Sequence, residues 1–150
     1  MAPLTLSSPE VQSFFVHSAI LALKVLCVGV LTIINRMIRK VFSNPEDAKL
    51  FRGNVKYDDL NVERIRRAHL NDLENIPVFW VLGALYLTTG PISTLAIMLF
   101  RVYTVCRIIH TIVYAVIPMP QPTRAIAFAI PVLIKWYLGI QVVLYYITAV

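Results

Sequence analysis

Three apolar segments, each longer than a membrane crossing requires, constrain how this chain can fold. They are residues 14–35, 92–117 and 122–147, with 22, 26 and 26 residues. A helix of roughly 20 residues crosses the hydrocarbon core of a bilayer, which is about 30 Å thick. Of all residues, 58% are hydrophobic, and the mean hydropathy is +0.71. The sequence therefore predicts an integral membrane protein of the all-α class.

A fourth helix is expected before residue 89, although its apolar part is short. Residues 76–89 would form only about 21 Å of helix at 1.5 Å per residue, which is too short to span. A full crossing must include Asn71, Asp72 and Glu74, and charges at membrane depth face the interior of a bundle. We therefore expect one four-helix transmembrane domain over residues 1–150. Its helices are expected at about 11–40, 62–89, 92–117 and 122–148, with a loop at about 41–61.

The distribution of positive charge predicts the orientation in the membrane. Of the 14 Lys and Arg residues, nine lie between Arg36 and Arg67, and residues 1–23 contain none. Positively charged loops stay in the cytosol, which places the 41–61 loop there and both termini on the far side. The first helix lacks the basic start and cleavage site of a signal peptide, so we expect an uncleaved anchor. The net charge of +6 follows from this topology, and nucleic acid is not an expected partner.

Two helix starts are expected around the loop. Asn44 followed by Pro45 and two acids is typical of a capped first turn. Asn61 followed by Glu63 resembles a second start, which would lead into a polar block at residues 63–75. The loop is therefore expected to be partly ordered.

Polar residues at matching depths indicate a functional site. Eight of them fall in the cytosolic half of the expected bundle: Arg36, Arg67, Asn71, Glu74, Arg107, His110, Tyr114 and Arg124. The arginines outnumber the nearby acids, and this surplus favours an anionic ligand. The alternative is structural, with buried pairs such as Glu74 and Arg107 only joining the helices.

Three further charged residues lie inside the expected spans. We expect Lys24 and Arg101 each to pair with another group inside the protein, whereas Lys135 has no expected partner. The three histidines lack the spacing of metal ligands, so no metal site is expected.

Several motifs follow one another between residues 36 and 128. They are Asn-Pro-Glu-Asp (44–47), Arg-Arg-Ala-His-Leu-Asn-Asp-Leu-Glu-Asn (66–75), Gly-Pro (90–91), Phe-Arg (100–101), Arg-x-x-His-Thr-x-x-Tyr (107–114) and Pro-x-Pro-Gln-Pro-x-Arg-Ala (118–125). In content and order this set resembles the microsomal glutathione transferases. These belong to the membrane-associated proteins in eicosanoid and glutathione metabolism, the MAPEG family.

The resemblance implies a homotrimer of four-helix subunits in the endoplasmic reticulum membrane, with the mitochondrial outer membrane as a second location. Glutathione would bind between neighbouring subunits, on the cytosolic side. Arg124 matches the arginine that the family uses to stabilise the thiolate, and is the expected catalytic residue. The family's other glutathione contacts fall on Arg36, Arg66, Arg67, His69, Asn71, Glu74, His110 and Tyr114. The depth argument adds Arg107 to this set of expected glutathione-binding residues.

The implied activity is conjugation of glutathione, as co-substrate, to apolar electrophiles from the bilayer, together with reduction of lipid hydroperoxides. One alternative is a glutathione-dependent prostaglandin E synthase. That relative carries Arg, Ser and Tyr where this chain has Leu70, Ala125 and Phe128. Another alternative is a non-catalytic, lipid-binding member of the family, but those relatives lack the His-x-Asn-Asp-x-Glu pattern at 69–74.

Overall fold

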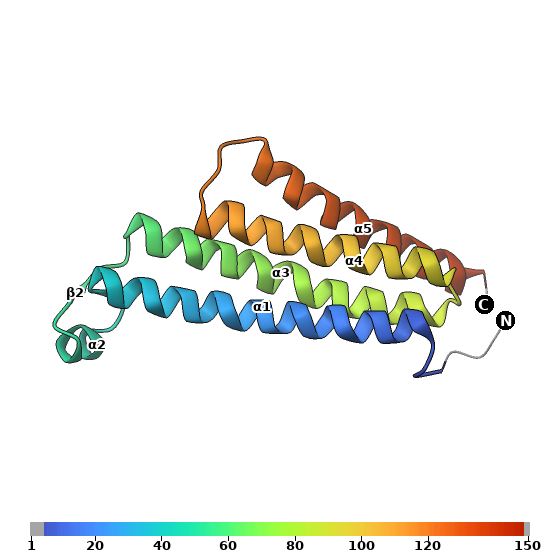
Figure 1. The fold of residues 1–150 in the computed structure, drawn as a ribbon, viewed down its shortest axis with the longest axis horizontal. Helices are drawn as coiled ribbons and strands as arrows, with labels where there is room; N and C mark the ends of the chain where they lie inside the picture. The colour runs from blue at the N-terminus through green and yellow to red at the C-terminus, as the bar shows by residue number, and fades with distance from the viewer. Residues whose placement is uncertain (1–4, 149–150) are drawn as a thin grey trace.

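The computed structural model describes residues 5–148 and consists mainly of four long helices packed side by side (Figure 1). Their bounds are α1 Pro9–Arg39, α3 Leu60–Thr88, α4 Ser93–Thr111 and α5 Thr123–Ile147. A short π-helix, η1 Ile112–Val116, continues α4. In Figure 1, α1 begins and α5 ends at one end of the bundle, opposite the connection between α1 and α3. The predicted all-α class is confirmed.

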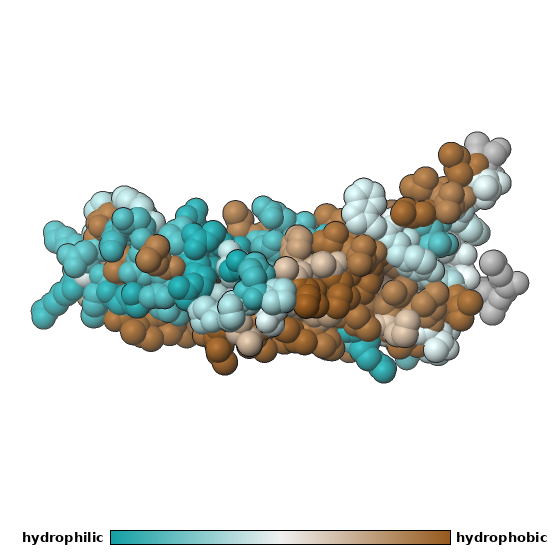
Figure 2. All heavy atoms as spheres, turned by 90° about the horizontal axis from the view of Figure 1, so that it is seen from above, coloured by the Kyte–Doolittle hydropathy of each residue, from teal (hydrophilic) through white to brown (hydrophobic). Residues whose placement is uncertain are grey.

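Three of the helical segments are long and apolar enough to cross a membrane, namely Pro9–Arg39, Ser93–Val116 and Thr123–Ile147. α3 has 29 residues, which is long enough to cross a membrane. Because its first half holds the polar block, however, α3 is not among the helices that are apolar enough to cross. Figure 2 shows hydrophilic residues gathered at the end of the molecule that holds α2, while hydrophobic residues dominate much of the remaining face. Three spanning helices are therefore supported, and a fourth crossing by α3 stays a prediction.

The connection between α1 and α3 is a small ordered unit. It contains a short helix, α2 Pro45–Leu50, between two strands, β1 Val41–Phe42 and β2 Asn54–Val55, which pair in parallel. The ring of Phe42 stacks on that of Phe51, with centroids 5.5 Å apart. α2 begins at Pro45, as the sequence predicts. The side chain of Asn44, however, bonds Asp47 rather than a backbone N–H.

The start of α3 is fixed by Asp59 and not by Asn61. Asp59 Oδ1 accepts hydrogen bonds from the backbone N–H groups of Asn61 and Val62, at 3.1 and 3.2 Å. It also accepts one from Nε of Arg39, the last residue of α1, at 2.9 Å. An aspartate at this position satisfies backbone donors that the first helical turn leaves free. The expected start at Asn61 is therefore wrong by two residues, because Asn61 already lies within the first turn.

Two apolar clusters fill the interior of the bundle. The larger one lies toward the end where α1 begins, and includes Phe14, Phe79, Phe100 and Tyr103. The rings of Phe79 and Tyr103 stack with centroids 3.9 Å apart, which joins α3 to α4. Gly83 allows Phe14 to approach α3, because a Cβ at Gly83 would lie 2.6 Å from the Phe14 ring.

The smaller cluster lies toward the α2 end, and a polar layer separates it from the larger one. It is built from Val28, Ile65, Ala68 and Ala115. On α3, Asp72 follows Ala68 by four residues and precedes Ile76 of the larger cluster by four. Polar groups inside such a core need partners from the protein. The candidate site starts from this layer.

Candidate functional site

Asp72 of α3 is the centre of a buried polar network. Its carboxylate forms ion pairs with Arg107 of α4 and with Lys24 of α1, the latter at 2.5 Å between Nζ and Oδ2. The hydroxyl of Thr111 donates to the same Oδ2 at 3.4 Å. The side chains of Asp72 and Arg107 are both fully buried. A single buried carboxylate is therefore compensated by two cations from two other helices.

Two asparagines extend this network to α5. Arg107 donates to Oδ1 of Asn71 at 3.0 Å, and the side-chain amide of Asn75 donates to the Asn71 carbonyl at 2.7 Å. Lys135 of α5 donates to Oδ1 of Asn75 at 2.5 Å. All four long helices thus meet in one layer, with α3 supplying Asn71, Asp72 and Asn75 and each of the others supplying one cation.

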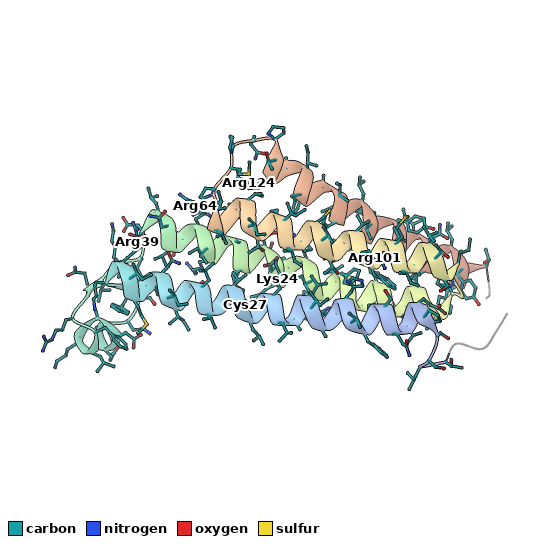
Figure 3. The ribbon with its side chains drawn as sticks, viewed as in Figure 1. Lys24, Cys27, Arg39, Arg64, Arg101 and Arg124 are labelled. Atoms are coloured by element: carbon teal, nitrogen blue, oxygen red, sulfur yellow. The ribbon has the colours of Figure 1, made fainter. Side chains whose placement is uncertain are left out.

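The pairing of the buried charges corrects part of the sequence analysis. The internal pairing of Lys24 is confirmed, and Lys135 has a partner in Asn75. The suggested pairing of Arg107 with Glu74 is wrong. Arg107 pairs with Asp72, which points inward, whereas Glu74 lies on the exposed face of α3. Arg101 is exposed and forms no ion pair within residues 5–148, so its expected internal pairing is also wrong. Figure 3 places Arg101 in the half of the molecule away from α2.

Arg124, at the start of α5, lies against an aromatic cluster. Its guanidinium carbon is 4.8 Å from the centroid of the Tyr114 ring, within the range of a cation–π contact. The His110 ring lies 5.6 Å from Tyr114 and 6.0 Å from Phe128. Figure 3 shows Arg124 in the half of the bundle that holds α2. α4, η1 and α5 therefore bring three of the predicted residues together.

A π-helical turn carries Tyr114. At the end of η1, the N–H of the next residue, Ile117, donates to the Ile112 carbonyl five residues earlier, at 2.8 Å. Such a turn rotates the side chains that follow it relative to those of a regular α-helix. His110 is buried at the end of α4, while Tyr114 is half-buried beside Arg124. The spacing in the sequence alone does not indicate this turn.

Several buried nitrogens of the predicted site residues have no hydrogen-bond partner within residues 5–148. They are Nε and one terminal nitrogen of Arg107, Nδ1 of His110 and one terminal nitrogen of Arg36. Buried polar atoms in proteins are normally bonded. A guanidinium can only donate hydrogen bonds. Acceptor oxygens of an anion would therefore suit either arginine.

The remaining predicted residues do not join this cluster within one chain. Arg66 pairs with Glu63 at 3.1 Å on the surface of α3. Arg67 and Glu74 are also exposed on α3, and His69 is half-buried facing α1 near Gly29. A site shared between subunits would require exposed residues of this kind. Their role in glutathione binding stays a prediction.

The helices and the buried, cation-rich layer together define a helical membrane protein with a polar site inside its bundle. The chain belongs to the MAPEG family, whose model matches residues 14–144. Microsomal glutathione S-transferase 1 from Homo sapiens is 43% identical over 123 residues, which cover 78% of each chain. The protein of the same name from Sus scrofa is 45% identical over 135 residues, covering 85% of this chain and 86% of the relative. Prostaglandin E synthase from Homo sapiens is 38% identical over 129 residues, covering 85% and 84%.

Proposed function

We propose that this protein is a membrane-bound glutathione transferase that conjugates glutathione to apolar electrophiles. The relatives named glutathione S-transferase support this proposal through their identity and coverage. The observation that carries it is the set of unpaired buried nitrogens on Arg107, His110 and Arg36. Glutathione has two carboxylates that can accept such hydrogen bonds, besides an ammonium group and a thiol.

The proposed reaction is nucleophilic attack by the glutathione thiolate. A free thiol is mostly protonated at neutral pH, so the site must favour the thiolate. Each unit of pKa lowering requires about 1.4 kcal/mol of differential stabilisation. A guanidinium in a site that excludes water can supply this, and we assign the role to Arg124. The thiol loses its proton to solvent, the sulfur bonds the electrophilic carbon, and the leaving group departs with its electron pair.

The assembly is proposed as a homotrimer, with α3 as the fourth span. Arg67 and Glu74 are charged and exposed on α3, beside residues such as Leu70 and Val78 that suit a membrane environment. Charged side chains at that depth are costly when they face lipid. A neighbouring subunit with glutathione between the two would cover them. We further propose that the α2 end lies in the cytosol and that the protein resides in the endoplasmic reticulum membrane, and also in the mitochondrial outer membrane.

Prostaglandin E synthase activity is the second candidate, because relatives of that name are 37–38% identical to this chain. The residues at Leu70, Ala125 and Phe128 argue against it, since each lacks the polar group expected in that enzyme. A third candidate is a non-catalytic lipid-binding role. Glutathione-dependent reduction of lipid hydroperoxides would accompany the transferase activity, because the same thiolate can attack a peroxide oxygen.

One set of assays separates these candidates. Detergent-purified protein is incubated with glutathione and one of three substrates: chlorodinitrobenzene, cumene hydroperoxide or prostaglandin H2. Conjugation without isomerisation supports the proposal, and isomerisation without conjugation supports the synthase. Absence of both activities would support the lipid-binding role. Native mass spectrometry of the same preparation would give the subunit count and the glutathione stoichiometry, and a monomer would contradict the shared site.

A further inference from the structure

Arg64 of α3 is a half-buried arginine that the predicted site does not include. In the part of the chain that the structure describes, residues 5–148, Arg64 forms no ion pair. The acid beside it in the sequence, Glu63, is engaged by Arg66 at 3.1 Å. The guanidinium of Arg64 therefore carries a positive charge that no carboxylate of these residues compensates.

The register of α3 places Arg64 on the side that meets the other helices. On this side, Asn71 accepts a hydrogen bond from Arg107 of α4, and Asn75 accepts one from Lys135 of α5. Arg64 precedes Asn71 by seven residues, which is two helical turns along the same face. Figure 3 agrees, because it shows Arg64 on the side of α3 toward the start of α5.

Arg64 and Tyr114 lie at the same level of the bundle. α3 begins at the α2 end and α4 runs back toward that end (Figure 1), and the two helices meet where Arg107 donates to Asn71 at 3.0 Å. Arg64 lies seven residues before Asn71, and Tyr114 lies seven residues after Arg107. Each is therefore displaced by about 10 Å toward the α2 end. α3 also packs directly against η1, which holds Tyr114, and the Tyr114 ring lies against the guanidinium of Arg124.

We propose that Arg64 binds the glycine carboxylate of glutathione and so fixes the direction in which the tripeptide lies along α3. This inference rests on the proposed function and adds one residue and one orientation to it. Arg64 from α3 and Arg124 from α5 bring two guanidinium groups to one level of the bundle, which favours an anionic ligand there. Arg124 then stabilises the sulfur, and the planar fork of Arg64 holds the carboxylate through two parallel hydrogen bonds.

Glu74 determines which of the two carboxylates reaches Arg64. It is the only acid among the predicted glutathione-binding residues, so the ammonium group of glutathione belongs beside it. That ammonium shares a carbon atom with the carboxylate of the γ-glutamyl end. Arg64 lies ten residues from Glu74, about 15 Å along α3. A fully extended tripeptide spans about 10 Å, and the two long side chains reach across the difference. The carboxylate near Arg64 is therefore the one at the opposite end, on glycine.

The test compares glutathione with its glycine monoethyl ester, in which that carboxylate carries no charge. Dissociation constants are measured by calorimetry for the full-length wild type and for Arg64→Gln. Arg64→Gln should weaken glutathione binding by about tenfold or more, the scale of one lost charge-assisted contact. It should leave binding of the ester unchanged, because the ester offers Arg64 no charge to hold. Arg64→Lys should retain part of the affinity, since it keeps the charge without the planar fork.

Three further measurements separate carboxylate binding from a structural role. At saturating glutathione, Arg64→Gln should keep the thiolate absorbance per bound glutathione, because Arg124 is intact. Its KM for glutathione should rise while kcat is retained. Its unfolding midpoint without glutathione should not fall, because Arg64 forms no ion pair within the described residues. Lys49→Gln is the matched control, since it removes an exposed cation on α2 and should bind both ligands as the wild type does.

The outcomes distinguish this proposal from the proposed function. Equal glutathione affinity in wild type, Arg64→Gln and Lys49→Gln would overturn the role of Arg64 and leave the transferase proposal standing. An equal loss for glutathione and for the ester would also overturn it, because Arg64 would then not hold the glycine carboxylate. A clear fall in the midpoint of the ligand-free Arg64→Gln protein would show a structural role instead. A wild type that binds no glutathione would overturn both proposals.

Discussion

Asp72 of α3 and Arg107 of α4 form an ion pair that is fully buried at the centre of the bundle. Lys24 of α1 completes the arrangement from the other side of the carboxylate. Because Lys135 reaches the same layer through Asn75, the network holds three cations and one carboxylate. The layer therefore joins the helices and at the same time keeps a surplus of positive charge inside the bundle.

Removing the carboxylate should destabilise the protein strongly. Asp72→Asn would leave Arg107 and Lys24 buried without a counter-charge, and breaking a buried pair in this way costs about 3–5 kcal/mol. We expect the thermal unfolding midpoint in detergent, without glutathione, to fall clearly below that of the wild type. Glu74→Gln is the matched control, because it neutralises an exposed carboxylate two residues away on the same helix. Equal midpoints for the two variants would contradict the central role of Asp72.

Glutathione binding, unlike the stability of the ligand-free protein, should depend on Glu74 and Arg67. If Glu74 and Arg67 contact glutathione between subunits, Glu74→Gln and Arg67→Ala should weaken binding by about 30-fold or more, the usual effect of truncating a desolvated charge pair. Neither change should lower the stability of the ligand-free protein, because both side chains are exposed in the single chain. Calorimetric titration with glutathione sulfonate measures the effect. Unchanged dissociation constants for both variants would remove Arg67 and Glu74 from the site.

The different positions of Asp72 and Glu74 show how far the sequence could predict this site. The spacing of Arg67, Asn71 and Glu74 suggests one helical face, but Asn71 accepts a hydrogen bond from Arg107 inside the bundle, whereas Arg67 and Glu74 are exposed. Spacing alone does not say which side of α3 meets the core. The stripe of small and apolar residues at Ile65, Ala68, Ile76 and Phe79 contains that information, and Asp72 lies on it. Asp72 could therefore have been recognised as the inward acid. Arg67 and Glu74 then fall on the outer face, where a single chain cannot reveal their partner.

The sequence predicts some parts of the fold better than others. The helical class and the apolar spans follow from segment length, because a bilayer requires about 20 apolar residues in a helix. β1 and β2 have two residues each, which is too short for any periodic pattern. The π-helical turn of η1 depends on packing between α4 and α5, so the contact of Tyr114 with Arg124 could be predicted only as a shared depth.

Arg124 should affect chemistry more than binding. In Arg124→Ala, turnover with chlorodinitrobenzene should fall by about two to three orders of magnitude, the scale for losing one electrostatic donor. Glutathione affinity should change only modestly. Arg124→Lys should recover part of the turnover, since an ammonium keeps the charge but not the planar fork. Tyr114→Phe keeps the ring beneath the guanidinium and serves to test whether the ring alone positions Arg124. Full turnover in Arg124→Ala would end its catalytic assignment.

Asp59 should make the junction of α1 and α3 sensitive to acid. The hydrogen bond from the Val62 N–H is the largest cause that lowers the pKa of Asp59 below its ordinary value of 3.8; burial opposes this, and Arg39 adds to it. A lowered pKa means that the carboxylate stabilises the fold above pH 3.8 and that this stabilisation is lost as the pH falls through the lower, folded-state value. Asp59→Asn should therefore melt below the wild type at neutral pH, and the gap should close in acid. A gap that does not depend on pH would contradict the role of the charge.

The formation of glutathione thiolate in the site can be measured directly by ultraviolet difference absorbance. Glutathione is titrated into the purified wild type and into Arg124→Ala at neutral pH, and binding is followed in parallel by calorimetry. We expect the wild type to show thiolate absorbance that saturates with bound glutathione, and Arg124→Ala to bind glutathione with most of that absorbance lost. Glutathione that binds to the wild type as a thiol, without thiolate absorbance, would contradict the proposed mechanism.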